Sequence, residues 1–355
     1  MTTPPVPVLT PTVSTPRKTP VTAGQPKAIY ALDPEALDLV YGPPDREAIA
    51  ALVDISDLVL TPDNWLEHKA LLAEVDFVFS GWKAPKFDAA FLAAAPKLRA
   101  VFYAAGSVRY CVSDAFWERG ILITSAADAN AVPVAEYTAA VSILALKQFW
   151  RRADLARRGI GWGDHTRPIP GAFRATIGLV SFGVIARKTA ELLSSHDVEI
   201  AVYCPFLTSE EASELGVRLV ALEELFRIAD VVSVHTPVLP ETVGLIDGKL
   251  ISLMKPDAAL INTARGVILD QPSVVEALRN RADITAVLDV TDPEPPQADD
   301  PLFTLPNVVV TPHIAGSHGR ECQRLGSYMV EELRRHLAGQ PLHWQVTQEM
   351  LARMA

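Results

Sequence analysis

Cysteine and long apolar runs are the features that this sequence has least of. Its 355 residues include three cysteines, Cys111, Cys204 and Cys322, which lie far apart and show no C-x-x-C spacing. An odd, scattered set predicts neither a disulfide framework nor a zinc site, so no metal is expected and a reducing, cytoplasmic location fits best. No apolar run approaches about 18 residues, and the amino terminus lacks a basic segment followed by an apolar one. A membrane span and a secretory signal are therefore not expected.

Basic residues are also too few for a surface that binds polyanions. Lys and Arg total 32 against 42 Asp and Glu, which gives a net charge of −10. This balance argues against nucleic acid or an anionic membrane as the main partner and favours a small ligand. At roughly 150 residues per domain, the length predicts about two domains.

The pattern along the chain predicts an α/β fold. Residues 1–26 are rich in Pro and Thr without apolar periodicity, so a disordered tail is expected there. Short apolar runs follow, alternating with amphipathic stretches near 62–73, 86–95 and 112–119, which is typical of a parallel sheet covered by helices. The five apolar runs are 27–32, 55–60, 76–81, 99–104 and 121–126.

The second half predicts a complete doubly wound sheet. A long helix over 132–158 is expected to cross between the domains, and a polar loop over 159–171 follows it. A helix near 318–338 and a short tail containing Trp344 are expected to fold back on the first domain. Six strands are predicted in this half, at 175–180, 198–203, 230–235, 257–263, 284–290 and 307–312.

Residues 176–193 indicate a strand, a tight turn and a helix that could hold a dinucleotide pyrophosphate. The three glycine positions of the G-x-G-x-x-G fingerprint are occupied by Ser181, Gly183 and Ala186. Gly183 would admit the pyrophosphate, and Ala186 is the smallest replacement that permits helix and strand to pack. An ordinary strand-to-helix turn is the alternative. The predicted cofactor-binding residues of the turn are Ser181, Phe182, Gly183, Val184 and Ile185.

The choice between NAD and NADP stays open at this level. The strand that should end in a ribose-binding carboxylate ends instead in Tyr203-Cys204-Pro205-Phe206. No cation lies between 205 and 211 to attract a 2′-phosphate, and Glu210 and Glu211 could oppose one, so the lean is to NAD. Arg187 and Lys188 could reverse this lean, although they are expected to face solvent.

Three reactive side chains follow three separate strands of the second half. Arg265 comes after the strand at 257–263, Glu294 after 284–290, and His313 after 307–312. Taken one at a time, Arg265 could form a surface ion pair, Glu294 could be a solvated loop residue, and His313 could be a turn residue. Because ligands bind beyond the carboxyl ends of such strands, their joint placement predicts one reactive cleft.

These stretches resemble the D-isomer-specific 2-hydroxyacid dehydrogenases, which include glyoxylate/hydroxypyruvate reductases and phosphoglycerate dehydrogenases. The likeness runs from about residue 27 to about 340. It is carried by HTPVLPETVGLI (235–246), MKPDAALINTARG (254–266), LDVTDPEPPQADDPLF (288–303), TPHIAGS (311–317) and PVAEYTAAVSILAL (133–146).

The resemblance implies a Rossmann-type cofactor domain, residues 129–317, inserted into a smaller flavodoxin-like substrate domain, residues 27–128 and 318–355. It also implies a homodimer and hydride transfer between a nicotinamide cofactor and a small 2-oxo acid or D-2-hydroxy acid. Arg265 would hold the substrate carboxylate and polarise its carbonyl, because a guanidinium offers a charged fork. His313 would transfer the proton, and Glu294 would orient the imidazole and favour its protonated form.

Other contacts follow from the same resemblance. The backbone amides of Gly106 and Ser107 would bind the substrate carboxylate, and Asp289 would contact the nicotinamide carboxamide unless it only stabilises a strand-end turn. Trp82 is a guess for the substrate side-chain pocket, with packing between the domains as the alternative. The backbone at Thr263 and Ala264 would lie along the nicotinamide. The adenosine would be flanked by His235, Thr236 and Pro237.

One departure from the family pattern stands out beside the substrate. Where the family has a hydrophobic-Asp-Asn-hydrophobic-Asp sequence after Gly106, this chain has Ser107-Val108-Arg109-Tyr110-Cys111. A nucleotide-sensing interaction protein on the same fold, similar to the corepressors of this family, is the competing interpretation. A lyase or sugar reductase would not place Arg, Glu and His in these motifs. The acidic charge favours the enzyme.

Overall fold

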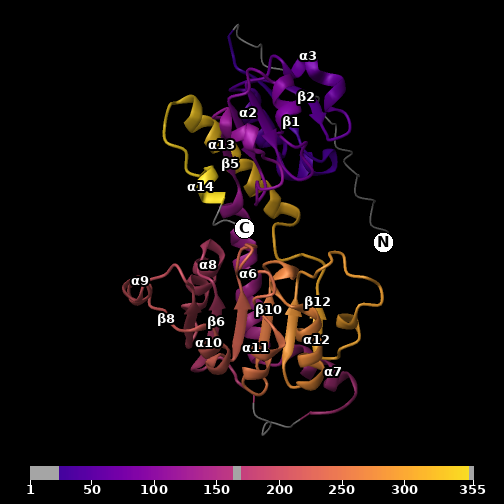
Figure 1. The fold of residues 1–355 in the computed structure, drawn as a ribbon, viewed down its shortest axis with the longest axis vertical. Helices are drawn as coiled ribbons and strands as arrows, with labels where there is room; N and C mark the ends of the chain where they lie inside the picture. The colour runs from indigo at the N-terminus through magenta and orange to yellow at the C-terminus, as the bar shows by residue number, and fades with distance from the viewer. Residues whose placement is uncertain (1–23, 163–168, 352–355) are drawn as a thin grey trace, which may run out of the picture.

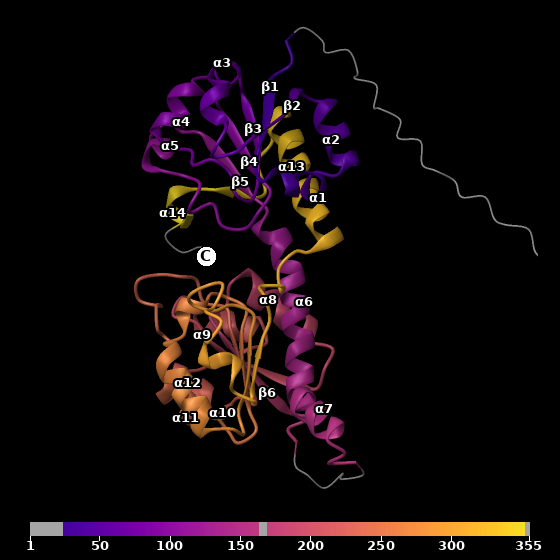
Figure 2. The same ribbon diagram turned by 90° about the vertical axis from the view of Figure 1, so that its right-hand side faces the viewer.

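The computed structural model describes residues 24–162 and 169–351 as two α/β lobes joined along one side by a long helix (Figures 1 and 2). The tail predicted for residues 1–26 lies outside the described residues up to residue 23. Residues 163–168 of the predicted polar loop lie outside them as well. The predicted fold class, a doubly wound parallel sheet beside a smaller α/β unit, is confirmed.

The first lobe is built on a 6-stranded sheet in the order β13-β5-β4-β3-β1-β2. The first five strands in the chain run parallel, and β13 pairs antiparallel with β5 at the edge. Apolar clusters cover both faces of this sheet, which explains why its strands are continuous apolar runs. The strands are β1 (Lys27–Ala31), β2 (Asp54–Leu60), β3 (Phe77–Ser80), β4 (Ala100–Tyr103), β5 (Leu122–Ser125) and β13 (Gln345–Val346).

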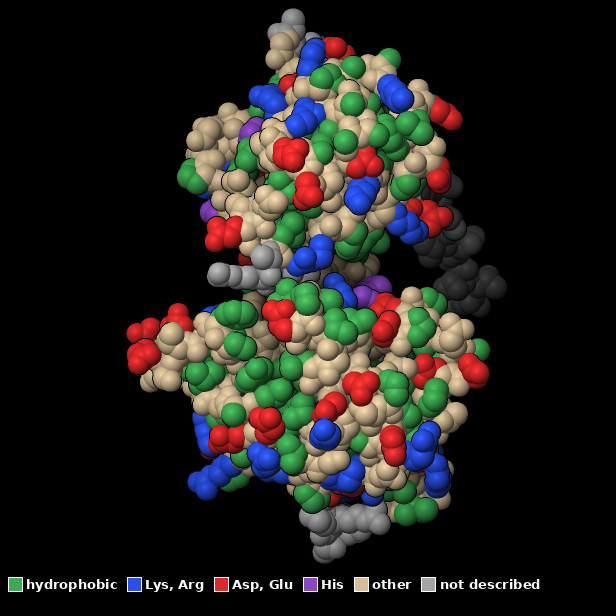
Figure 3. All heavy atoms as spheres, viewed as in Figure 1, with side chains coloured by type: hydrophobic (Ala, Val, Ile, Leu, Met, Phe, Trp, Pro, Cys, Tyr) green, Lys and Arg blue, Asp and Glu red, His purple; other side chains and the backbone are tan. Residues whose placement is uncertain are grey.

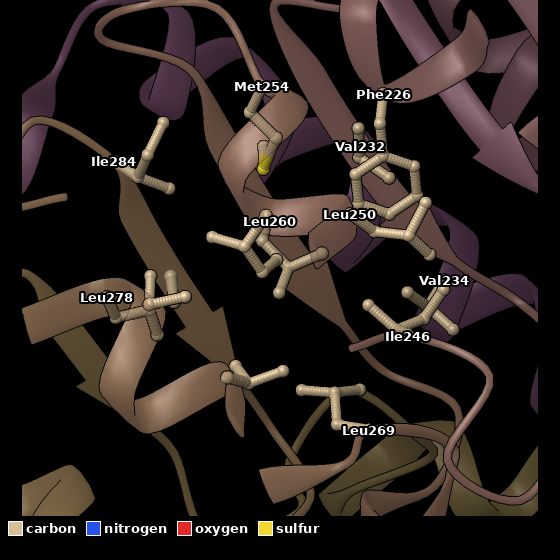
Figure 4. Close-up of a cluster of buried hydrophobic side chains, with 14 of the residues drawn as sticks. Phe226, Val232, Val234, Ile246, Leu250, Met254, Leu260, Leu269, Leu278 and Ile284 are labelled. Atoms are coloured by element: carbon tan, nitrogen blue, oxygen red, sulfur yellow. The ribbon is translucent and has the colours of Figure 1, made fainter. Parts of the chain in front are cut away.

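The second lobe holds a 7-stranded parallel sheet in the order β12-β11-β10-β9-β6-β7-β8. Figure 4 shows part of the apolar cluster on one face of this sheet, including Phe226, Leu250 and Leu260. Six strands were expected, and the seventh, β8, has two residues, too few to show a pattern in the sequence. The strands are β6 (Ala175–Val180), β7 (Val198–Tyr203), β8 (Arg218–Leu219), β9 (Val231–Val234), β10 (Ala259–Asn262), β11 (Thr285–Leu288) and β12 (Val308–Val310).

Helices cover both sheets (Figures 1 and 2). In the first lobe they are α1 (Leu37–Val40), α2 (Pro43–Ala50), α3 (Lys69–Leu72), α4 (Ala89–Ala94), α5 (Asp114–Glu118), α13 (Cys322–Leu337) and α14 (Gln348–Leu351). In the second lobe they are α8 (Val184–Leu193), α9 (Ser209–Glu214), α10 (Leu222–Ile228), α11 (Gly248–Leu253) and α12 (Gln271–Asn280).

The helix predicted over 132–158 is two helices, α6 (Ala127–Leu146) and α7 (Phe149–Arg157). Gln148 separates them, because its backbone is left-handed at φ 52° and ψ 39° and cannot continue an α-helix. The 20 residues of α6 would span a membrane by length and composition, but 56% of its most apolar window is buried within the fold. Core helices of globular proteins share these properties, so the length of α6 is only weak evidence for a membrane span.

The last described residues return to the first lobe. The apolar face of α13 packs into the cluster that holds β1, β3 and β4, as the predicted return requires. Gly326 makes this contact possible, because a Cβ there would overlap the Val40 carbonyl oxygen of α1. The first sheet is therefore assembled from both ends of the chain.

Candidate active site at three neighbouring strand ends

Three adjacent parallel strands bring the predicted catalytic residues to one edge of the second sheet. Strands β10, β11 and β12 are neighbours, and the loops that leave their carboxyl ends carry Arg265, Glu294 and His313 respectively. Figure 3 shows His and Lys or Arg side chains at the boundary between the two lobes, with acidic side chains close by. This edge of the second sheet faces the first lobe across that boundary.

Glu294 and His313 form a direct pair. The distance from Glu294 Oε1 to His313 Nδ1 is 2.5 Å, and both side chains are partly exposed, at 40% and 44%. With Nδ1 held by the carboxylate, the opposite ring nitrogen, Nε2, is the atom left to exchange a proton with a ligand. His313 has a left-handed backbone, with φ 54°, an unfavourable conformation that the surrounding loop must hold in place.

Asp289 holds that loop. Its carboxylate is 1% exposed and accepts hydrogen bonds from Thr311 Oγ1 at 2.6 Å, from the Ile314 N–H at 2.8 Å and from the Ala315 N–H at 2.9 Å. Its carbonyl oxygen also accepts from the His313 N–H at 2.9 Å. These contacts are those of a residue that stabilises a strand-end turn, and a contact with the nicotinamide carboxamide stays a prediction.

Tyr137 extends this network to α6. Its hydroxyl lies 3.1 Å from Thr311 Oγ1, and burial raises its pKa. On the same helix, Asn130 Oδ1 accepts the Ser317 N–H at 2.9 Å. The connecting helix therefore supports both ends of the loop that carries His313. The sequence analysis did not identify these two residues, because a contact from a helix to a loop 174 or more residues away has no local signal.

The loop of Arg265 is shaped by Asn262, another residue that the sequence analysis did not identify. Asn262 is fully buried at the end of β10, and its amide donates to the Arg265 carbonyl at 2.9 Å and accepts the Ala264 N–H at 3.0 Å. The Arg265 guanidinium donates to the Ala264 carbonyl at 2.6 Å. Thr263 is buried and lies 3.4 Å from Thr138 of α6 through their hydroxyl oxygens. The loop is thus fixed in the backbone, while the guanidinium is only partly buried.

The predicted carboxylate-binding loop leaves β4 on the other lobe. Ser125 Oγ donates to the carbonyls of Ala105 and Gly106, which fixes the peptide groups there. Within residues 24–162 and 169–351, the N–H groups of Gly106 and Ser107 have no hydrogen-bond acceptor. A Cβ at Gly106 would meet nothing within 4 Å, so the space beside these donors is open. Two adjacent free N–H groups beside open space suit a carboxylate.

Trp82 is partly buried and packs against both apolar clusters of its own lobe. Its carbonyl accepts the Asp33 N–H at 2.7 Å, and the next residue, Lys83, pairs with the Asp33 carboxylate at 2.6 Å. This ion pair lowers the pKa of Asp33. A role for Trp82 in the substrate pocket stays a prediction.

The glycine turn fits a dinucleotide pyrophosphate. Gly183 is the N-cap of α8, no side chain caps that end, and a Cβ on Gly183 would meet nothing within 4 Å. The first N–H groups of α8, including those of Val184 and Ile185, are therefore available to an anion. Ala186 is fully buried against the strands, and Ser181 has φ 76°, a conformation that favours glycine. The turn keeps the geometry of the fingerprint although the first glycine is absent.

The predicted adenosine contacts surround the ends of β7 and β9. Cys204 is partly buried and packs against the apolar cluster that contains Phe182, so its sulfur is not simply turned to solvent. The His235 imidazole Nε2 lies 3.0 Å from Ser233 Oγ, and burial lowers its pKa to about 4. Thr236 donates to the Val180 carbonyl at 3.3 Å, and the Pro237 carbonyl accepts from Thr242 at 2.7 Å. Contacts of these residues with a cofactor stay predictions.

The chain is similar to known dehydrogenases. Residues 140–315 match the family model described as D-isomer specific 2-hydroxyacid dehydrogenase, NAD binding domain. The chain is 32% identical over 297 residues to a D-3-phosphoglycerate dehydrogenase from Mycobacterium tuberculosis, covering 84% of this chain and 52% of that protein. It is 35% identical over 256 residues to an (S)-sulfolactate dehydrogenase from Chromohalobacter salexigens, covering 71% of this chain and 82% of that protein.

A solved structure supports the fold as well. A phosphoglycerate oxidoreductase from Rhizobium etli superimposes with a TM-score of 0.78 at 22% identity, covering 92% of this chain and all of that one. This chain spans about half the length of the phosphoglycerate dehydrogenases that it matches. The arrangement of an arginine, a histidine–carboxylate pair, free backbone donors and an anion-binding helix end can bind a carboxylate and move a proton beside a dinucleotide.

Proposed function

Because this chain belongs to the D-isomer specific 2-hydroxyacid dehydrogenase family, we propose that it reduces a small 2-oxo acid to the D-2-hydroxy acid with a nicotinamide cofactor. The observation that carries the proposal is the 2.5 Å pair of Glu294 and His313, which follow β11 and β12, at the same sheet edge as Arg265, which follows the neighbouring strand β10. If Glu294 and His313 formed only a surface ion pair, there would be no reason for Arg265 to lie at the same sheet edge.

The substrate carboxylate would be bound from both lobes. The free N–H groups of Gly106 and Ser107 would take one side, and the guanidinium of Arg265 would take the other. Arg265 would also face the carbonyl oxygen of the substrate, where negative charge grows during reduction. A guanidinium remains charged at every relevant pH, so it stabilises that charge without giving up a proton.

His313 would supply the proton. Its Nε2 would donate to the carbonyl oxygen, and Glu294 would keep the ring oriented. A bound nicotinamide would supply the hydride. In the reverse direction the same nitrogen would accept the proton from the hydroxyl. Asp289 and Asn262 would hold the two reactive loops without touching the substrate.

For the cofactor, we propose NAD in preference to NADP. The pyrophosphate would lie at the N-terminus of α8, and the ribose beside Cys204. Glu211 is fixed near this region by a capping box with Thr208, whose N–H donates to the Glu211 carboxylate at 2.9 Å. Arg187 is exposed, as expected, and its guanidinium lies over the Phe182 ring at 4.8 Å. Hydrogen bonds with Thr208 lower the pKa of the Glu211 carboxyl, and the charge of Arg187 adds a smaller contribution. A fixed carboxylate here would repel a 2′-phosphate.

A homodimer, formed through the second lobe, is part of the proposal. Leu144, Phe149, Ile160, Trp162 and Phe173 are 37–79% exposed and come from one stretch of chain, from the end of α6 to the start of β6. Large exposed apolar side chains favour a protein partner, and a second copy would bury them symmetrically. Cys111 and Cys322 are free and buried, which agrees with the proposed cytoplasmic location.

A panel of 2-oxo acids tests the proposal: glyoxylate, hydroxypyruvate, pyruvate and longer branched acids, each with NADH and NADPH. We expect turnover of at least one acid, and Arg265→Met to lower kcat/KM by several hundredfold with the nucleotide Kd nearly unchanged, since a charged bidentate contact contributes several kcal/mol. Tight nucleotide binding without turnover of any acid would favour the alternative, a nucleotide-sensing interaction protein.

A further inference from the structure

The last residues of the described chain form a second layer behind the substrate loop, which we define as residues 105–111. After α13 the chain turns back, and the buried carboxylate of Glu332 accepts the N–H groups of His343 at 3.0 Å and Trp344 at 3.2 Å. The Trp344 ring stacks on Tyr328 with centroids 3.9 Å apart. The path of the carboxyl-terminal segment is therefore fixed by a polar and an aromatic contact with α13.

This segment then joins the strand that supports the substrate loop. Strand β13 pairs with β5, and the Trp344 carbonyl accepts the Ser125 N–H at 3.0 Å. Ser125 is also the residue whose hydroxyl holds the Ala105 and Gly106 carbonyls. One residue thus connects the returning chain to the first peptide groups of the substrate loop.

A second connection comes from α14, the helix after β13. The Arg109 guanidinium of the substrate loop donates a hydrogen bond to the Leu351 carbonyl at the end of α14. The Leu351 side chain packs against the same apolar cluster that contains Val108 and Cys111. Figure 2 shows α14 at the lower end of the first lobe, on the side that faces the second lobe.

We propose that Arg109 and α14 act together as a clamp that positions the substrate loop, so that Arg109 serves substrate binding without touching the substrate. The proposal rests on the proposed function, because it takes the free N–H groups of Gly106 and Ser107 to be carboxylate donors. The substrate loop contains Ser107-Val108-Arg109-Tyr110-Cys111, and the hydrogen bond from Arg109 to α14 restrains it in this stretch. A flexible loop would lose entropy on binding the substrate, and a clamped loop has already lost it.

Two variants test the clamp from its two sides: Arg109→Met, and a chain that lacks residues 348–355. We expect each to raise KM for the 2-oxo acid about tenfold, the cost of losing one charge-assisted hydrogen bond, with kcat and the nucleotide Kd changed less than twofold. Arg109→Lys should recover most of the loss, since an ammonium can still donate to a carbonyl. Combining Arg109→Met with the truncation should add little to either alone.

Arg119→Met is the matched control. Arg119 also donates from its guanidinium to backbone carbonyls of the same lobe, those of Leu92, Ala95 and Pro96, none of which belongs to the substrate loop. This variant should lower the unfolding temperature and leave KM unchanged. If Arg119→Met raised KM equally, general loosening of the lobe would explain the result and the clamp would be refuted.

Amide hydrogen exchange gives a readout that needs no turnover. In the unliganded protein, residues 105–112 should exchange at least fivefold faster in Arg109→Met and in the truncated chain, and at the normal rate in Arg119→Met. Unchanged exchange in the first two would overturn the clamp even if KM rose. A KM raised by Arg109→Met but not by the truncation would also overturn it, because Arg109 would then contact the substrate directly. A wild-type chain that turns over no 2-oxo acid would refute the proposed function and leave the exchange result to decide on the clamp.

Discussion

Gly266 lies so close to Thr291 that the two loops carrying Arg265 and Glu294 touch through their backbones. A Cβ on Gly266 would overlap the carbonyl group of Thr291, and the amide nitrogen of Asp292 lies just beyond it. Since Gly266 directly follows Arg265 and Thr291 begins the loop of Glu294, this contact sets the spacing between the guanidinium and the histidine–glutamate pair.

Substitution Gly266→Ala should therefore separate the reactive groups. The added methyl must displace one loop, which costs about 1–3 kcal/mol of the free energy of unfolding. A displacement of about 1 Å at a reactive site can lower turnover about 100-fold. We expect a loss of that size in kcat/KM, measured together with the thermal unfolding midpoint.

Gly326→Ala provides the comparison, because its methyl would overlap the Val40 carbonyl oxygen of the first lobe and would not touch the loops that carry Arg265, Glu294 and His313. It should lower the unfolding midpoint similarly but leave kcat/KM near the wild-type value at a temperature where the protein is folded. Equal losses of activity in both variants would mean that stability, and not loop spacing, limits turnover.

Ser181→Gly should stabilise the protein. Ser181 adopts φ 76°, which costs an L-residue about 1–2 kcal/mol, while the greater freedom of glycine in the unfolded chain offsets about half of this. A gain of about 0.5–1 kcal/mol in the free energy of unfolding is expected from urea denaturation. Ser181→Ala keeps the Cβ and should give no gain in the free energy of unfolding. An equal gain from alanine would mean that the serine hydroxyl, and not the left-handed backbone, destabilises the protein.

Glu294→Gln should weaken catalysis with little effect on nucleotide binding. Glutamine can still contact His313 Nδ1 but carries no charge to stabilise the imidazolium, so kcat/KM should fall about 100-fold. Asp292→Asn removes a charge from the same exposed loop, where Asp292 has no hydrogen-bond partner among the described residues. A similar loss in both variants would point to the overall negative charge of the loop.

The three proposed catalytic residues could be located in the sequence because each follows a strand that its own apolar run identifies. Buried parallel strands are continuous apolar runs, and their carboxyl ends share an edge, so the positions of Arg265, Glu294 and His313 required no long-range information. The glycine turn could be recognised for the same reason, since strand, turn and helix are contiguous.

The supports of the site could not be predicted in this way. Tyr137 and Asn130 contact the His313 loop across more than 170 residues, and Arg109 contacts Leu351 across 242. Such contacts depend on how the two lobes are placed, which no local periodicity records. The break between α6 and α7 at Gln148 could not be predicted either. Glutamine is a good helix former, and only its left-handed backbone interrupts the helix.

His235 should make the stability of the protein depend on pH. Burial lowers the pKa of its imidazole to about 4, whereas an unfolded chain has the ordinary value of 6.5. The folded state thus excludes a proton that the unfolded state binds, so the contribution of neutral His235 is complete above pH 6.5 and is lost as the pH falls from 6.5 towards 4.

At pH 5 this loss amounts to at most about 2 kcal/mol, since each pH unit below 6.5 costs about 1.4 kcal/mol. His235→Gln keeps a polar partner for Ser233 but cannot titrate, so its stability should fall less between pH 7.5 and pH 5 than that of the wild type. The difference between the two proteins in urea denaturation isolates His235, because His336, whose pKa is also lowered by burial, is present in both. Identical pH dependence would mean that His235 takes up its proton without unfolding, and that the end of β9 admits water beside the proposed adenosine contact.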